Sequence, residues 1–365
     1  MGSLSLVDRE LLRVIADIAE AAGDGELALV ARLALAVPPV RRRSDRAHGL
    51  FRLDSLSPEQ CRSRFRVDAT GIRLMASALR LPATVRVPGL GCAVDRDMAM
   101  CILLRRLCYP ARWADPEAEF GRSSAFLCHV FIHMIKVVDR RFATRMRLSP
   151  ALAPRLRRYA GAVRRKRVPL RTCFGFVDGT AWRVCRPTWH QRELYSGHKR
   201  YHCLKFQAVM LPDGIIADLS GPFHGRQNDQ YMLNESQLED RLSDPVFDNY
   251  FLYGDQGYTY SSHVARPFRA ADMDELRSAF NERMAIVRVS VEWGFARVKQ
   301  LFAFLSFVPS LRVYSSHVGK FYRVAVLLSN MIMCLEGKSE ASEYFRCSPP
   351  SLAVYMSQFL ATASA

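Results

Sequence analysis

The sequence predicts an α/β domain built around a mixed β-sheet that is flanked by helices and preceded by an all-α region. Two observations carry this prediction. Before about residue 150, apolar residues recur at helical spacing, three or four positions apart. From residue 172 onward, short apolar runs typical of strands alternate with helical segments. The chain has 365 residues, 49% of them hydrophobic, which is enough for a sizeable core.

Five segments are expected along the chain. They are an N-terminal helical and basic segment (1–50), a helix-turn-helix-like helical domain (51–150), a basic linker (151–171), the α/β domain (172–340) and a C-terminal tail (341–365). Within the first segment, residues 4–36 are apolar at helical spacing. Two short helices are predicted over residues 56–82. The first begins at SPEQ, with Ser57 as N-cap and Gln60 at the capping-box position.

Residues 95–142 predict three helices in a helix-turn-helix arrangement. The first ends before Pro110, and a short second helix over residues 114–120 is followed by a turn at Gly121. The third, over residues 123–142, has an apolar stripe and an opposite basic face formed by His129, His133, Lys136 and Arg140. A longer helix with a basic face after a glycine turn is typical of DNA-binding helix-turn-helix units. A plain three-helix packing unit with a solvated basic face is the alternative.

Charge favours a polyanionic partner, most often nucleic acid. The net charge is +17, and residues 140–171 hold twelve Lys and Arg but no Asp or Glu. Acidic lipid, or solubility alone, is the alternative explanation. The motif RRKR at 164–167 fits a nuclear-import signal, a nucleic-acid patch or a solvated linker. We therefore expect the nucleus as the location, with the cytoplasm as a second one.

The cysteines and the apolar runs exclude several protein classes. None of the ten cysteines forms a C-x-x-C pair, which disfavours a zinc site and indicates reduced thiols in an intracellular protein. The N-terminus lacks the pattern of a secretory signal, and no uncharged apolar run reaches membrane-spanning length. We therefore expect a soluble protein.

The α/β domain begins with apolar runs that predict strands. These runs are TCFGFVDG (172–179), HCLKFQAVMLPDG (202–214), IIADLSGPF (215–223) and YFLYGD (250–255). Pro-Asp-Gly at 212–214 is the expected turn of a hairpin. Residues 228–242 predict a helix between strands, and residues 283–307 predict a long helix.

Three acids stand at unusual positions in this domain. Asp178 and Asp255 each end an apolar strand, and Glu292 borders an apolar helix stripe. Taken singly, the aspartates fit strand-ending turns, and Arg288, one turn before Glu292, could be the partner of that acid. Together, two strand-end aspartates and a helix glutamate can converge on one pocket. Oxygen ligands of this kind suit Mg²⁺ or Mn²⁺, and two such ions can act on a phosphodiester.

Several motifs in the expected order carry a family resemblance. FVDGTAWRV, YGDQGY and VRVSVEWGFARVKQLF resemble the DDE endonuclease domain of PIF/Harbinger-type transposases and their domesticated nuclease relatives. The upstream MCILLRRLCYPARWADPEAEFGRSSAF and the downstream LLSNMIMCLEGKSEASEYFRCSPPSL resemble the same family, so the resemblance covers roughly residues 50–355.

The resemblance implies an RNase H-like fold and a DNA-cutting DDE triad that binds two divalent metal ions. By its motifs, the triad is Asp178 of VDGT, Asp255 of GD-x-x-Y and Glu292 of V-E-x-x-F. The chain departs from the family at Asn228-Asp229, where His commonly precedes the aspartate, and after Asp255, where small residues or proline are usual. Asp229 is an auxiliary or rival acid, and we expect it to cap a helix or to lie beside the ligands.

Basic residues near the triad are expected to bind nucleic acid. Lys199 and Arg200 precede a strand and suit DNA phosphates. Lys299 could hold a phosphate of the cut strand, and Arg288 is also expected to bind nucleic acid. A solvated surface charge is the alternative for each. The resemblance also implies a Myb-like DNA-binding accessory protein and leaves a homodimer open.

Three functions remain in competition after these observations. The first is an active metal-dependent DNA nuclease or transposase, which the complete acidic triad favours. The second is a domesticated, catalytically silent factor that binds DNA or a protein through the helix-turn-helix and the basic linker. The third, an RNA-directed nuclease of the same fold, is disfavoured because the resemblance is to DNA enzymes.

Overall fold

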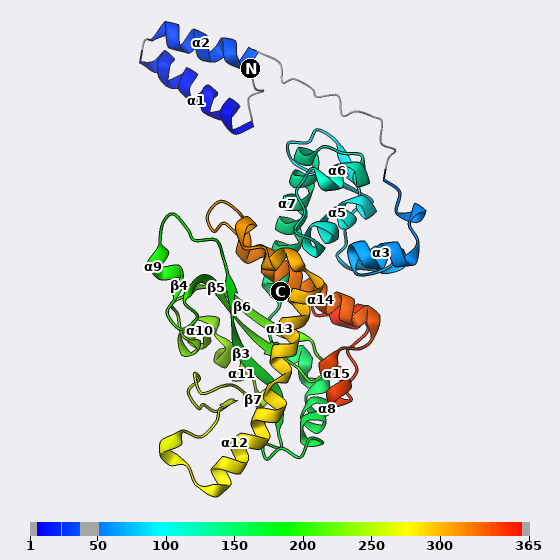
Figure 1. The fold of residues 1–365 in the computed structure, drawn as a ribbon, viewed down its shortest axis with the longest axis vertical. Coiled ribbons are helices and arrows are strands. Elements are labelled where there is room, and N and C mark those ends of the chain that lie inside the picture. Colours follow the sequence, from blue (N-terminus) through cyan, green and yellow to red (C-terminus); the bar gives the residue numbers. More distant parts are fainter. Residues whose placement is uncertain (1–5, 23, 37–50, 360–365) are drawn as a thin grey trace. The chain divides into compact units, whose positions relative to one another are not determined.

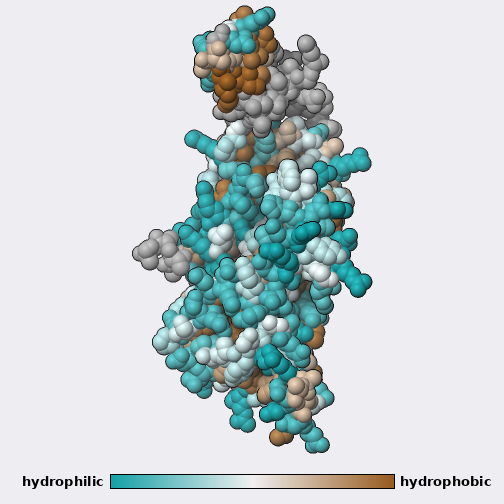
Figure 2. Space-filling model, turned by 90° about the vertical axis from the view of Figure 1, so that its left-hand side faces the viewer, coloured by the Kyte–Doolittle hydropathy of each residue, from teal (hydrophilic) through white to brown (hydrophobic). Residues whose placement is uncertain are grey.

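A computed structural model describes residues 6–22, 24–36 and 51–359. The chain divides into two compact units, residues 1–49 and 50–365. The first unit is a helical hairpin of α1 (Leu6–Ala21) and α2 (Gly25–Ala36), which confirms the predicted helical segment. Small side chains are buried between its helices, and several large apolar side chains are exposed, which Figure 2 shows as a brown cluster. The basic residues 41–46 lie outside the described part of the chain.

The second unit begins with a helical region that follows the predicted pattern. Its elements are η1 (Leu53–Ser55), α3 (Pro58–Phe65), α4 (Ala69–Ala78), α5 (Arg96–Cys108), α6 (Asp115–Phe120), α7 (Ser124–Arg141) and a small antiparallel hairpin of β1 (Thr84–Arg86) and β2 (Ala93–Asp95). The predicted capping box of α3 is present: the Ser57 hydroxyl accepts from the Gln60 N–H, and the Gln60 side chain accepts from the Ser57 N–H. Gly121 ends α6 in the left-handed conformation at φ 59°.

Helix α7 is tied to the rest of the unit. Its apolar face is buried against α5 and α14 (Val318–Glu336). On the same helix, Asp139 accepts two hydrogen bonds from Arg323 of α14, at 2.7 and 2.8 Å. The opposite face leaves His129, Lys136 and Arg140 exposed. This arrangement fits a DNA-contacting helix and a plain packing unit equally well, so the helix-turn-helix interpretation stays a prediction.

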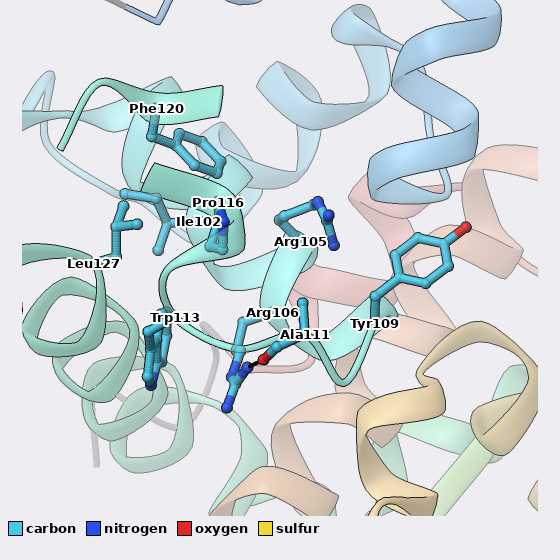
Figure 3. Close-up of a pocket in the computed structure, with 9 residues that line it drawn as sticks. All are labelled: Ile102, Arg105, Arg106, Tyr109, Ala111, Trp113, Pro116, Phe120 and Leu127. Carbon is cyan, nitrogen blue, oxygen red and sulfur yellow. Dashed lines mark hydrogen bonds between the residues drawn. The ribbon is translucent and has the colours of Figure 1, made fainter. Parts of the chain in front are cut away.

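Arg106 of α5 joins the helical region to a segment far along the chain. Figure 3 shows its guanidinium beside Trp113, with a hydrogen bond to the Ala111 carbonyl. The guanidinium carbon lies 4.3 Å from the Trp113 ring centre and 4.7 Å from that of Phe304. Burial lowers the pKa of Arg106. The cavity here is only about 10 Å³, so these side chains fill the space between the helices.

The predicted basic linker differs from the structure. Residues 153–164 form helix α8 (Ala153–Arg164), which packs against strand β3, after the short turns η2 (Ala143–Arg145) and η3 (Pro150–Leu152). Leu156, Tyr159 and Val163 recur at helical spacing among the arginines and are buried. The Tyr159 hydroxyl donates to buried Asp213 at 2.6 Å. Because an apolar stripe is hidden among the charges, this segment is a packed helix inside the second unit.

A mixed β-sheet lies at the centre of the second unit, as the sequence predicts (Figure 1). Its strands are β3 (Cys173–Arg183), β4 (Tyr195–Ser196), β5 (Tyr201–Met210), β6 (Ile216–His224), β7 (Phe251–Tyr253) and β8 (Val264–Ala265). The order is β4-β5-β3-β7-β8, and β6 pairs with β5. β5 is antiparallel to β3 and β6, whereas β7 is parallel to β3 and β8. The predicted hairpin between β5 and β6 is confirmed.

Helices and short turns surround the sheet. They are α9 (Gln191–Leu194), α10 (Asp229–Ser236), α11 (Leu238–Leu242), η4 (Pro245–Phe247), η5 (Ala270–Asp272), α12 (Glu275–Arg288), α13 (Ser290–Leu301), η6 (Ala303–Ser306), η7 (Val308–Ser310), α14, α15 (Glu340–Phe345) and α16 (Leu352–Ser357). Two predicted helices are each divided. Gln237, at φ 53°, separates α10 from α11, and the long helix predicted over 283–307 is interrupted at Val289.

Helix α14 is the long core helix of the second unit. Within the described residues it is the one helix whose length and composition would allow it to cross a membrane. However, 78% of its apolar window is buried inside the protein. Its contacts with α7, α13, β6 and α16 are typical of a helix at the centre of a core.

Candidate active site

Asp178 lies within strand β3 and not at its end. The antiparallel pairing of β3 with β5 continues to Arg183, and Asp178 is paired with Ala208. The prediction of a strand ending at Asp178 is therefore wrong, because alternate residues such as Trp182 are still buried after it. The Asp178 side chain is only 15% exposed. It is therefore a largely buried acid on a strand that has neighbours on both sides, β5 and β7.

Asp255 follows the neighbouring strand at an equivalent position. Phe176 of β3 is paired with Tyr253 of the parallel strand β7, and Asp178 and Asp255 each come two residues later. This register brings both aspartates to the same side of the pair along the sheet. Asp255 Oδ1 accepts a hydrogen bond from the Gly257 N–H at 2.8 Å, which holds the carboxylate in the turn after β7.

Asp229 is a third acid at the same place. It is the first residue of α10, whose N-cap is Asn228: the Asn228 side chain accepts from the Tyr231 N–H at 2.8 Å. A β-carbon added to Gly257 would lie 2.7 Å from Asp229 Oδ2 and 3.0 Å from Asp255 Oδ1. Asp229 Oδ1 would also meet a β-carbon added to Gly179. Asp229 is therefore not the helix cap, and its carboxylate faces Asp178 and Asp255 across two glycines.

Glu292 is linked to Asp178 indirectly, by an arginine that lies between the two carboxylates. Arg288, the last residue of α12, lies 3.7 Å from Asp178 Oδ2 and 3.8 Å from Glu292 Oε1. The expected pairing of Arg288 with Glu292 is thus present, and the same guanidinium also contacts Asp178. The apolar stripe beside Glu292 is buried as predicted, while the Glu292 side chain is 59% exposed.

Burial and mutual repulsion dominate the electrostatics of the three aspartates. The pKa of Asp178 is raised from 3.8 to about 7, chiefly by burial; Arg288 lowers it, and the charges of Asp255 and Asp229 add to the rise. Burial and Asp255 likewise raise the pKa of Asp229. Buried Tyr258 lies close enough that all three aspartates add to the effect of burial and raise its pKa. The carboxylates therefore share one electrostatic site in which negative charge exceeds positive charge.

The comparison with family models decides what this site belongs to. Residues 177–330 match the model of the DDE superfamily endonucleases. The matched range contains all four acids described above, and its mixed sheet flanked by helices is consistent with a DDE nuclease fold. Residues 177–330 are therefore similar to the endonuclease domains of the DDE superfamily. No curated protein and no solved structure matched the chain.

The acids of the matched domain have donor chemistry that suits a divalent cation. Two other buried acids are paired closely with arginine: Asp139 meets Arg323 at 2.7 Å, and Asp218 meets Arg241 at 2.8 Å. A third, Asp213, accepts a hydrogen bond from the Tyr159 hydroxyl at 2.6 Å. The arginine contact of Asp178 is about 1 Å longer, so this carboxylate lacks a close counter-ion. Oxygen-only ligands of this kind are those that Mg²⁺ and Mn²⁺ prefer.

The acids do not form a preorganised metal site in this structure. Among the residues that the structure describes, no group of three or more His, Cys, Asp or Glu side chains is arranged to hold a metal ion. Arg288 bridges Asp178 and Glu292, where a shared cation would otherwise join them. The residues thus fit a divalent ion by their chemistry, but Glu292 can share it with Asp178 only if the guanidinium moves.

The predicted nucleic-acid ligands differ in their surroundings. Lys199 and Arg200 are exposed in the turn before β5. Lys299 is also exposed, and its Nζ lies 5.3 Å from the centre of the Trp182 ring. Arg288 is held by two acids and faces the carboxylate site. On α7, His133 is half-buried, and burial together with Lys136 lowers its pKa.

Sequence reasoning underestimated Asp229 and did not single out Tyr258 as part of the site. The signals were present: Gly179 follows Asp178, Gly257 follows Asp255 by two residues, and Tyr258 is the tyrosine of the GD-x-x-Y motif. Both glycines leave the space that the Asp229 carboxylate occupies. That space is visible only after β3, β7 and α10 have come together.

We expect Gly179→Ala to destabilise the domain by about 1–3 kcal/mol in urea denaturation. The added methyl group would meet the Asp229 carboxylate and lie 2.8 Å from Met232 Cε. Gly161→Ala in α8 is the matched control, because no atom lies within 4 Å of its added carbon. Adding Asp229→Ala should recover part of the stability that Gly179→Ala removes. A Gly179→Ala protein as stable as the wild type would contradict the placement of Asp229.

Proposed function

We propose that this protein is a metal-dependent DNA endonuclease of the transposase type. The carrying observation is that Asp178 on β3 and Asp255, just after the adjacent parallel strand β7, lie at equivalent positions inside the matched domain, where burial raises the pKa of Asp178. Asp178, Asp255 and Glu292 would hold two Mg²⁺ or Mn²⁺ ions, with Asp229 as an auxiliary acid. Bound divalent ions of this kind stabilise the attacking and leaving oxygens of a phosphodiester.

The protein's own residues would bind and position the DNA. The β3–β7 pair fixes the two aspartates, and α13 presents Glu292 from beside the sheet. Lys199 and Arg200 are exposed, so their cationic side chains can contact the backbone phosphates of the DNA. The test is nicking of a supercoiled plasmid by the full chain in Mg²⁺ or Mn²⁺, with EDTA as the control.

A second candidate is a catalytically silent DNA- or protein-binding factor. The observation that favours it is Arg288, which bridges Asp178 and Glu292 and takes the position of a shared cation. An arginine that stayed there would hold the acids as a structural ion-pair network. Plasmid that remains uncut in Mn²⁺ while still being bound would support this candidate over the nuclease.

Nuclear location, a Myb-like accessory protein and a homodimer remain proposals that the described residues do not test. In the segment 164–167, Lys166 Nζ lies 3.6 Å from the centre of the Tyr344 ring, and Arg165 donates to the Phe345 carbonyl at 3.2 Å. An import receptor would therefore have to engage the segment beside α15, or release it. The exposed Arg164 and Arg167 favour the first arrangement.

We expect Arg288→Gln to tighten Mn²⁺ binding by about fivefold, because removing a cation beside the acids removes about 1 kcal/mol of repulsion toward the metal. Binding is measured by isothermal titration calorimetry and by the EPR signal of free Mn²⁺, so the readout does not depend on cleavage. Arg283→Gln, an exposed residue on the same helix, is the charge-matched control. Weaker Mn²⁺ binding by Arg288→Gln would show that Arg288 organises the ligands instead of competing with the metal.

A further inference from the structure

A strongly basic cavity lies at the C-terminal end of strand β3. Its volume is about 430 Å³, and it is formed by the end of β3, the turn before β5 and the segment after η7. Four arginines line it: Arg183, Arg186, Arg200 and Arg312. Tyr195, Tyr201 and His202 line it as well, and none of its described lining residues is acidic.

The four guanidinium groups lack carboxylate partners. Within the part of the chain that the structure describes, none of them forms an ion pair, whereas Arg241 and Arg323 meet buried acids at 2.7–2.8 Å. Arg186 instead donates two hydrogen bonds to the Gln191 side-chain oxygen, at 3.1 and 2.9 Å. Uncompensated positive charges that converge on one cavity repel each other and favour an anion between them.

The walls of this cavity are held by backbone contacts. The Cys185 N–H donates to the Leu311 carbonyl at 3.0 Å, which fastens the segment carrying Arg312 to the end of β3. Arg183 lies over the Tyr201 ring, 5.7 Å from its centre. The arginines thus come from three segments of the chain that lie around one cavity, and all four are exposed to solvent.

The side chains of this cavity select a phosphodiester strand. The planar guanidinium binds phosphate oxygens bidentately, and aromatic rings beside such groups suit the faces of bases. The volume is in the range of pockets that hold a small organic ligand and is ample for one nucleotide unit. Tyr195, at 41% exposed, offers its ring to such a base.

The distance from the acids to the cavity indicates which part of a DNA substrate the cavity would bind. Asp178 and Arg183 are five residues apart on one strand, which corresponds to about 17 Å. Consecutive phosphates of one DNA strand are about 3.4 Å apart along the helix axis, so this span is roughly five nucleotides. We propose that the four-arginine cavity binds the backbone of the DNA substrate about five nucleotides from the bond placed at Asp178. This inference rests on the proposed nuclease function.

The experiment measures DNA binding without cleavage. Fluorescence anisotropy of labelled duplex and single-stranded DNA is recorded in EDTA, from about 50 to about 200 mM NaCl, for the wild type and for Arg183→Ala/Arg312→Ala. At the lower salt concentration the affinity should fall by about tenfold or more. The slope of log K against log salt should lessen by roughly 0.9 for each duplex phosphate that the variant no longer binds. Arg157→Ala/Arg171→Ala removes the same charge from exposed positions outside the cavity.

Several outcomes decide the proposal. An equal fall in affinity in both double variants, or an unchanged affinity in the cavity variant, would overturn it. Arg183→Lys/Arg312→Lys should keep the salt slope but bind DNA more weakly, since lysine retains the charge and lacks the bidentate geometry. Competition by millimolar inorganic phosphate alone, with no difference between the variants on DNA, would point to a free-phosphate site and reject a DNA contact. Preferential binding of polyglutamate through the arginines would assign the cavity to an acidic protein.

The same measurement separates this proposal from the nuclease function. Binding in EDTA requires no metal and no cleavage, so the cavity variant can bind DNA more weakly even if the wild type never cuts it. Conversely, cleavage that depends on Asp178 together with unchanged DNA affinity of the cavity variant would uphold the nuclease and reject the cavity as its DNA contact.

Discussion

Asp178→Asn and Asp255→Asn should each lower the rate of metal-dependent plasmid nicking by about a thousandfold. A bound divalent ion supplies several kcal/mol of charge stabilisation to a phosphodiester displacement, and each 1.36 kcal/mol is about a factor of ten in rate. Asp178 lies on β3 and Asp255 in the turn after β7, and replacing one carboxylate oxygen by an amide nitrogen changes the side-chain volume little. The rate is measured with Mn²⁺ by the disappearance of supercoiled plasmid.

The control for this prediction is Asp248→Asn, which changes an exposed aspartate just before β7. It should nick at the wild-type rate. Glu292→Gln and Asp229→Asn separate the two assignments of the third ligand. The proposed triad requires the larger rate decrease at Glu292, whereas a larger decrease at Asp229 would assign the third position to the acid that faces the glycines. Nicking that is unaffected by Asp178→Asn would reject the proposed active site.

In the absence of metal, Asp178→Asn should also make the protein more stable above pH 7, by up to about 4 kcal/mol. The pKa of Asp178 rises from 3.8 to about 7 on folding, and each unit corresponds to about 1.36 kcal/mol. Between these two pH values the folded state binds more protons than the unfolded state. Wild-type stability therefore falls as the pH rises through this window, and the cost is complete above pH 7.

The measurement is urea denaturation of both proteins in EDTA from pH 5 to pH 8. The gain from Asp178→Asn should be about 1–2 kcal/mol at pH 5 and should grow toward pH 8, because asparagine carries no charge at either pH. The substitution also removes the ion pair with Arg288, which offsets part of the gain. Adding Mn²⁺ at pH 8 should stabilise the wild type and not the variant. A difference between the two proteins that does not change with pH would show that burial does not hold the pKa of Asp178 high.

Local features of the fold followed directly from neighbouring residues. The capping box at Ser57 and Gln60, the helix that stops at Gly121 and the β5–β6 hairpin around residues 212–214 are all present. Each depends on interactions within a few positions of the chain, so a single sequence contains what is needed to predict them. The motifs around Asp178, Asp255 and Glu292 likewise indicated the domain that the family model matches.

Features that depend on partners distant in the sequence are the ones that sequence patterns do not predict correctly. The basic segment before the sheet has the charge of a linker, which conceals Leu156, Tyr159 and Val163, and these are buried only because β3 offers a face to cover. The predicted strand β3 is too short because Asp178 resembles a strand end, whereas pairing with β5 extends the strand to Arg183. In both places a tertiary contact overrides a local preference.

By itself, the sequence determined a basic chain with a helical region, a mixed sheet and three acids whose order resembles that of DDE endonucleases. Only the tertiary structure decided how those acids meet. It placed Asp229 over two glycines beside Asp178 and Asp255, set Arg288 between Asp178 and Glu292, and gathered four arginines at the far end of β3. The reason is physical: burial and electrostatic interaction depend on distances in space, and these exist only once distant segments have packed.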